Sequence, residues 1–76
     1  MSLIDFALMT RTGTEINVIC LISNKSTGEF SIENFTTDNR CSDVSFDNQN
    51  AYVGIISSVK ENVMLVHTYR YIIEEE

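Results

Sequence analysis

Apolar and polar residues alternate along most of the chain, a period of two that is typical of β-strands. The run 14–23 is the strongest example, with Ile16, Val18, Cys20 and Ile22 on one face. Its other face also carries apolar residues, and apolar side chains on both sides indicate a central strand with both faces at least partly covered. β-branched residues dominate the apolar set, which favours strands further.

The clearest hairpin lies in the second half of the chain. The runs 51–59 and 63–73 both alternate, and Lys60, Glu61 and Asn62 connect them. Asn tolerates the left-handed backbone conformation that a tight hairpin loop requires. We therefore expect two long antiparallel strands, with Asn62 at positive φ.

The start of the chain fits two structures. The run 3–10 alternates as a strand would, but Leu3, Phe6 and Ala7 also have the spacing of a helix face. A strand is favoured, because the following Gly13 suits a hairpin loop that leads into the next strand. The helix remains the alternative.

Two shorter strands complete the expected set. The run 29–36 places Phe30 and Ile32 on the inward face and the residues between them outward. A later aromatic residue falls out of this phase, which predicts a bulge near Asn34. The run 44–46, flanked by polar turn residues, is expected to be a short fourth strand.

These segments predict an all-β fold. Residues 1–76 are too few for two domains, so we expect one small β domain. Its architecture is a single antiparallel sheet of about six strands built from hairpins and curled into a barrel or folded over as a sandwich. The core of such a short chain is thin, and a partner subunit often stabilises proteins of this size.

The composition of the chain argues against two classes of function, nucleic-acid binding and membrane association. Eleven acidic residues against five basic ones give a net charge of −6, and the basic residues are scattered. A protein that binds nucleic acid directly needs a basic patch to neutralise phosphates, so we expect no such binding. No apolar run approaches the ~20 residues of a membrane span, and no signal peptide is visible, so we expect no membrane association and a cytoplasmic location.

The residues with metal-binding or catalytic chemistry form no motif. His67 is the only histidine, and Cys20 and Cys41 are too far apart along the chain to suggest a zinc site. We expect Cys20 to be buried and Cys41, in a polar loop, to be the exposed and reactive thiol, with a bridge between them left open. Asp43 and Asp47 lack the glycine-containing loop that calcium sites favour. We therefore expect no cofactor, no metal and no enzymatic activity.

The last strand is the predicted binding surface. It is apolar on both faces and rich in tyrosine, a residue enriched at protein interfaces, which indicates a protein partner or self-association into a homo-oligomer. The glutamates that follow it would steer the partner by their charge. The predicted contact residues are His67, Tyr69, Arg70, Tyr71, Glu74, Glu75 and Glu76.

The sequence thus predicts a small acidic, non-catalytic protein-binding module, an inhibitor or regulator that occupies a macromolecular partner. Small acidic chains rich in Asn and Ile, without cofactor motifs, resemble in style the accessory proteins of phages and mobile elements. The alternative is a structural subunit of a symmetric homo-oligomer or a virion-like assembly, whose function is its packing.

Overall fold

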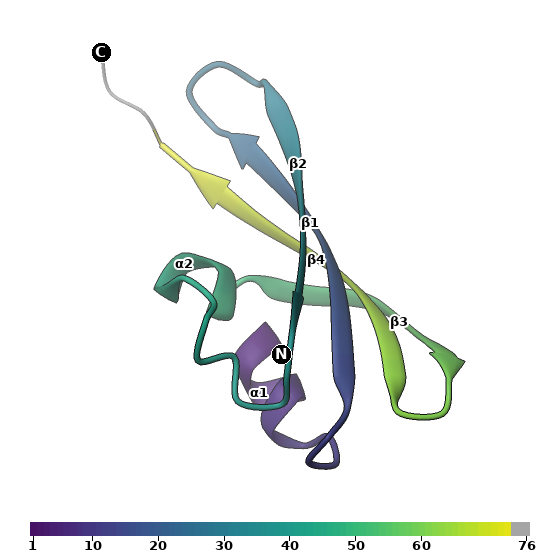
Figure 1. The fold of residues 1–76 in the computed structure, drawn as a ribbon. Helices are drawn as coiled ribbons and strands as arrows, with labels where there is room; N and C mark the ends of the chain where they lie inside the picture. Colours follow the sequence, from purple (N-terminus) through teal and green to yellow (C-terminus); the bar gives the residue numbers. More distant parts are fainter. Residues whose placement is uncertain (74–76) are drawn as a thin grey trace.

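The computed structural model describes residues 1–73, which form one mixed four-stranded sheet with two short helices (Figure 1). The sheet is open: no barrel closes within the described residues. The chain is mostly β, as expected, but with four strands instead of six. In chain order the elements are α1 (Leu3–Leu8), β1 (Glu15–Asn24), β2 (Phe30–Thr37), α2 (Phe46–Gln49), β3 (Tyr52–Lys60) and β4 (Val63–Ile72).

The strand order is β2-β1-β4-β3, so the two longest strands lie side by side in the centre. β1 and β4 are parallel over ten residue pairs, from Glu15 opposite Val63 to Asn24 opposite Ile72. The two flanking pairs, β1–β2 and β3–β4, are antiparallel. The expectation of a purely antiparallel sheet is therefore wrong. Alternation could not reveal this, because a strand shows the same period in parallel and antiparallel pairing.

The favoured strand over residues 3–10 is also wrong, because this segment forms α1. The Ser2 side chain caps the helix by accepting a hydrogen bond from the Asp5 backbone N–H at 3.3 Å. Leu3 and Ala7, one turn apart, are both completely buried. The helical spacing prevails because it directs these two side chains to the same side, against the sheet.

The expected fourth strand at 44–46 is replaced by the start of α2. The Ser45 hydroxyl accepts a hydrogen bond from the Asn48 backbone N–H at 3.3 Å and caps this single turn. The Gln49 side chain donates to the backbone carbonyls of Cys41 and Val44 at 3.0 and 2.9 Å. These bonds hold the loop before α2 in place, so its polar residues fold a compact turn where alternation indicated an extended segment.

The inward face of β2 is the opposite of the one expected. β2 pairs with β1 without interruption, and Val18 lies opposite Phe35. Phe35 therefore packs against the core, while Phe30 and Ile32 lie on the other face, with 71% and 60% of their surface exposed. No bulge forms near Asn34, since the register runs straight through it.

The hairpin of β3 and β4 is confirmed, and Asn62 in its turn has φ 64°. β3 carries a register shift between Val53 and Ile56. β1 is a central strand, as its doubly apolar pattern predicted, but the expected cover on both sides is wrong: the side that carries Leu21, 39% exposed, has no element of residues 1–73 over it.

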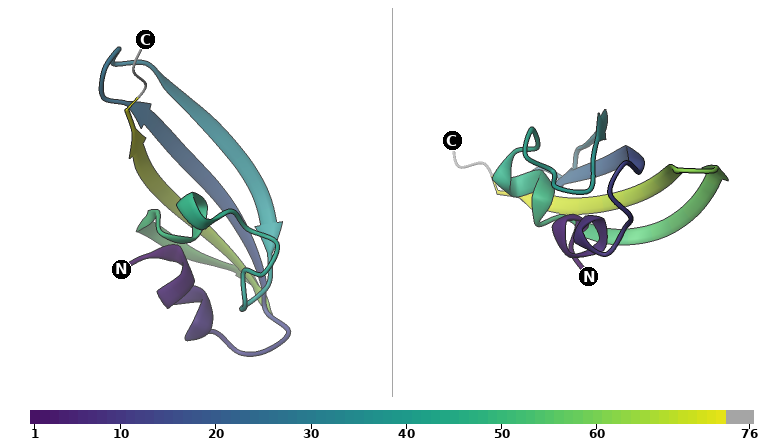
Figure 2. Two further views of the ribbon diagram at one scale, coloured as in Figure 1. Left: turned by 90° about the vertical axis from the view of Figure 1, so that its left-hand side faces the viewer. Right: turned by 60° about the horizontal axis from the view of Figure 1, so that its bottom comes forward.

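Only one side of the sheet is covered. Both helices and the segment before α2 lie on the same side, as the rotated views show (Figure 2). This covered side holds the buried apolar residues of the described chain, namely Leu3, Ala7, Ile16, Val18, Cys20, Ile22, Cys41, Ala51 and Val66. No element of residues 1–73 covers the other side of the sheet, which we call the open face.

Candidate functional site

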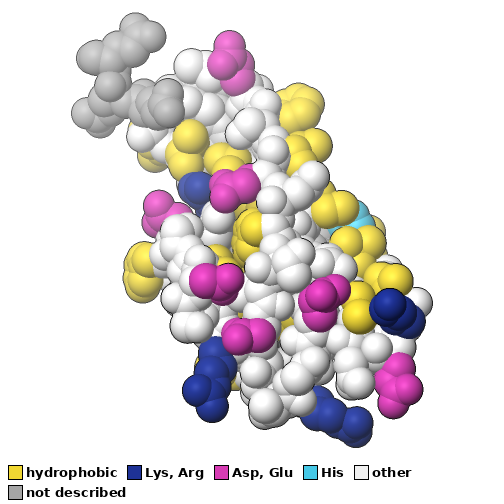
Figure 3. Space-filling model, viewed as in Figure 1, with side chains coloured by type: hydrophobic (Ala, Val, Ile, Leu, Met, Phe, Trp, Pro, Cys, Tyr) yellow, Lys and Arg dark blue, Asp and Glu magenta, His cyan; other side chains and the backbone are white. Residues whose placement is uncertain are grey.

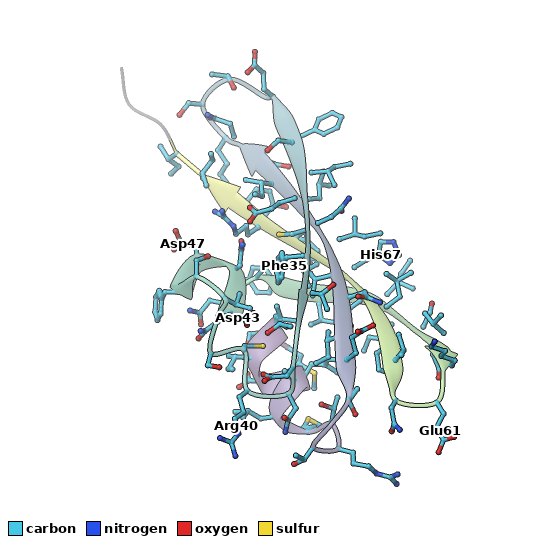
Figure 4. The ribbon with its side chains drawn as sticks, viewed as in Figure 1. Phe35, Arg40, Asp43, Asp47, Glu61 and His67 are labelled. Atoms are coloured by element: carbon cyan, nitrogen blue, oxygen red, sulfur yellow. The ribbon has the colours of Figure 1, made fainter. Side chains whose placement is uncertain are left out.

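The open face is built from the alternate residues of all four strands. The register places Ile19 beside His67 and Leu21 beside Tyr69, and Leu21 also lies opposite Ile32. Paired residues of neighbouring strands point to the same side of a sheet. His67 accordingly projects away from the helices (Figure 4).

This face exposes an unusually large apolar area. Its seven most exposed large apolar side chains have between 39% and 71% of their surface open to solvent. At about 200 Å² for each fully exposed side chain, these fractions amount to roughly 800 Å², whereas the largest apolar patch of a typical monomer is about 300–600 Å². We call these residues the apolar set; they are Leu21, Phe30, Ile32, Tyr52, Ile55, Tyr69 and Tyr71.

The middle of the open face is hollowed. A shallow groove of about 360 Å³ crosses the strands there. Gly54 lies at the β3 edge of this groove, and a Cβ at that position would come within 3.4 Å of the His67 carbonyl oxygen. The residues whose side chains line the groove include Ile19, Leu21, Ile32, Ile55, His67 and Tyr69.

Tyrosines form one end of the apolar set. The rings of Tyr52 and Tyr69 stack with their centroids 5.4 Å apart, and Tyr71 meets Tyr69 edge-on at 6.4 Å. The Lys25 ammonium lies 4.7 Å from the centre of the Tyr71 ring. Because each ring is held by a neighbour, the cluster is partly ordered before anything binds to it.

Among the described residues, the charged side chains of the open face lie at its two ends. Glu15 and Lys60 lie at one end, where β1 begins and β3 finishes, and Lys25 lies at the other. Asp43 and Asp47, in contrast, lie on the helix side (Figure 4). The space-filling view shows the yellow apolar side chains gathered along the right-hand margin, beside the cyan histidine, while acidic groups are spread over the helix side (Figure 3).

His67 has no arrangement typical of catalysis. Its Nδ1 is buried and makes no hydrogen bond with any described residue. A histidine that activates a nucleophile is oriented by a third group that hydrogen-bonds to its ring. The geometry is that of a histidine packed among apolar neighbours on the open face.

Arg70 faces the opposite side from His67, Tyr69 and Tyr71. Its Nε donates to the Asn48 Oδ1 at 2.8 Å, and the Asn48 amide in turn donates to the Glu33 carboxylate at 3.2 Å. This chain of bonds ties β4 to α2 and β2. The structure therefore brings together His67, Tyr69 and Tyr71 but not Arg70, and the predicted contacts Glu74, Glu75 and Glu76 lie outside the described residues.

Both cysteines are free and completely buried, so the expectation of an exposed, reactive Cys41 is wrong. Cys41 has a left-handed backbone with φ 54°, and its Sγ lies 3.8 Å from the Asp38 carbonyl oxygen. Burial raises the pKa of the Cys41 thiol, and the carboxylates of Asp38 and Asp43 raise it further against a lowering hydrogen bond with Thr37. Among residues 1–73, no three side chains of His, Cys, Asp or Glu cluster in a way that could hold a metal ion.

The predicted contact residues omit five members of the apolar set, namely Phe30, Ile32, Leu21, Tyr52 and Ile55. One signal could have found the first two. Phe35 is out of phase with them, and taking Phe35 as the inward residue moves the earlier two to the outside. Ile55 lies in the register shift of β3, where alternation no longer indicates the face.

Comparisons place no further constraint on this surface. In the part of the chain that the structure describes, neither helix has the length and apolar composition needed to cross a membrane. Comparison of the chain with family models, with curated proteins and with solved structures found no match.

Proposed function

We propose that the chain is a non-catalytic protein-binding module that inhibits or regulates a macromolecular partner by occupying it. The open face is the contact surface. The observation that carries this proposal is the apolar set, whose exposed area of roughly 800 Å² equals the share that one partner contributes to a standard protein interface.

The chemistry of the face supports a protein as its partner. Tyr52, Tyr69 and Tyr71 supply amphipathic rings, which are enriched at the energetic centres of interfaces. His67 lies beside them, and Phe30 extends the surface along β2. The proposal keeps His67, Tyr69 and Tyr71 as contacts and assigns Arg70 to the support of α2.

The proposed regulator is of the phage or mobile-element type and acts in a cytoplasm-like compartment. Both thiols are unpaired, as is usual where the surroundings are reducing. The net charge of −6 would favour approach to a basic partner surface, and the uncharged centre of the open face would then make the contact.

The alternative is a structural subunit of a symmetric homo-oligomer or virion-like assembly, in which the open face would be the contact between identical copies. Four strands and one covered face leave roughly 800 Å² of apolar area exposed, which two copies would bury as an interface of standard size. In that case the chain would have no partner of another kind.

A pull-down with matched variants tests the proposal. The tagged chain serves as bait in an extract of its native host, beside a Tyr69→Ala/Tyr71→Ala double variant and a Phe46→Ala control on α2. We expect the wild-type chain and the control to retain the same partner and the double variant to lose it by about tenfold or more, the effect of removing one or two interface anchors.

Circular dichroism establishes that each bait is folded. Tyr69 and Tyr71 are 41% and 53% exposed and Phe46 is 78% exposed, so truncation should leave the fold intact. Equal retention by the wild-type chain and a folded double variant, or no specific retention by the wild-type chain, would contradict the proposed function.

A further inference from the structure

We propose that a second copy of this chain occupies the open face, in a face-to-face homodimer that a hetero-partner must displace. This inference rests on the open face being the contact surface of the proposed function. It adds the identity of the resting occupant and, with it, a form of regulation, because self-association and partner binding compete for the same residues.

The area of the face meets the requirement of a stable dimer. The apolar set exposes roughly 800 Å², and a two-fold symmetric pair contributes this area twice, so about 1,600 Å² would be buried. Crystal-type contacts between unrelated surfaces are mostly below about 800 Å² in total. The open face is thus large enough to support a specific dimer without help from any other part of the chain.

The distribution of charge favours a second copy over a charged partner. A chain of net charge −6 resists self-association unless its acidic groups stay apart. Asp5, Asp43 and Asp47 lie on the helices or the segment before α2, on the covered side. Two copies joined through their open faces would point these carboxylates in opposite directions, and no charged side chain of residues 1–73 would be buried at the centre.

The surface that best matches an uncharged apolar sheet face is another such face. Two sheets pack face to face about 10 Å apart with their strands nearly aligned, and the side chains of the facing surfaces interdigitate. In the pair, each groove would receive side chains from the other copy. The result is an eight-stranded sandwich in which the helices form the outer layers.

Sedimentation velocity and light scattering over concentrations from low micromolar to millimolar test the inference. Ile32→Glu and Ile55→Glu place a carboxylate on the open face, at positions 60% and 66% exposed, where the monomer tolerates it. Phe46→Glu and Met9→Glu are the matched controls, 78% and 73% exposed and outside the open face.

We expect the wild-type chain and both controls to sediment at twice the 8.6 kDa of the monomer. The two open-face variants should be folded monomers, with dimerisation about a hundredfold weaker or more. In the symmetric dimer each copy would bring its own new carboxylate into the apolar interface, so two unpaired charges would be buried. Circular dichroism verifies that they are folded. A wild-type monomer at every concentration, or a dimer that persists in both open-face variants, overturns the inference.

The outcomes separate the two proposals. A monomeric wild-type chain that still retains a host partner through Tyr69 and Tyr71 overturns the dimer and leaves the proposed function standing. A dimer that Ile32→Glu dissociates, in a chain that retains no host partner, supports the dimer and contradicts the proposed function. If both hold, excess untagged wild-type chain should reduce partner retention and excess Ile32→Glu chain should not.

Discussion

At the scale of single residues, a shift of one position in β2 decides which side chains face the core. With Phe35 inward, Phe30 and Ile32 must lie on the open face, since alternate residues of a strand point to opposite sides. The sequence of β2 is compatible either with Phe30 and Ile32 facing the core or with Phe35 facing it. The register with β1 determines which face of β2 points to the core, because it sets Phe35 opposite the buried Val18.

Cys41 gives a prediction at the same scale. Because burial raises its thiol pKa above the ordinary value of 9.0, the unfolded chain loses this proton at a lower pH than the folded chain does. The unfolded state then binds fewer protons, so the free energy of unfolding falls as the pH rises above about 9. Denaturant unfolding at pH 8 and at pH 10 should show a larger loss of stability in the wild-type chain than in Cys41→Ala.

The comparison with Cys41→Ala removes the pH-dependent contributions of all other groups, because the two proteins share them. Cys41→Ala itself should be less stable than wild type at pH 8, because the completely buried sulfur leaves a small cavity. An equal loss of stability in the two proteins between pH 8 and pH 10 would contradict the burial of this thiol.

At the scale of elements, the β3–β4 turn depends on one residue. Asn62 has φ 64°, and its carbonyl oxygen also accepts a hydrogen bond from the Glu15 backbone N–H at 2.7 Å. Asn62→Ala should lower the free energy of unfolding by about 1 kcal/mol, because alanine tolerates the left-handed conformation less well than asparagine does. Asn62→Gly should stay within about 0.5 kcal/mol of wild type.

Thermal unfolding or urea denaturation measures both changes. Glu61→Ala in the same turn is the control, since an exposed position without positive φ should change stability by no more than about 0.5 kcal/mol. The turn geometry would be contradicted if Asn62→Ala were as stable as Asn62→Gly.

The elements also show how far the sequence alone predicts this fold. β1 and the β3–β4 hairpin were predictable because long alternation and local turn chemistry determine them. The helical segments were harder to predict, since α1 and α2 each span six residues or fewer and depend on caps at Ser2 and Ser45; the sequence offered α1 only as the alternative, and no pattern indicated α2. The parallel pairing of β1 with β4 joins residues 48 positions apart, such as Glu15 and Val63, and no local pattern encodes such a contact.

For the candidate site, the sequence identified the strand but only part of the surface. Tyr69, Tyr71 and His67 share a face because they alternate along β4, which a period of two predicts. Arg70 falls between them and so points to the covered side, where it bonds to Asn48. Neighbouring strands supply the rest of the surface, and their contribution depends on a sheet order that only the structure shows.

At the scale of the whole molecule, a sheet with one covered face links stability to assembly. If dimerisation covers the open face, unfolding separates two chains, and its midpoint then depends on protein concentration. Each tenfold increase adds about 1.4 kcal/mol per dimer, which for two chains of this length raises the thermal midpoint by about 4 °C. Ile32→Glu should melt at a lower temperature and show no such dependence, while Phe46→Glu should follow the wild type. Differential scanning calorimetry at several concentrations measures this, and a concentration-independent wild-type midpoint would contradict a dimer coupled to folding.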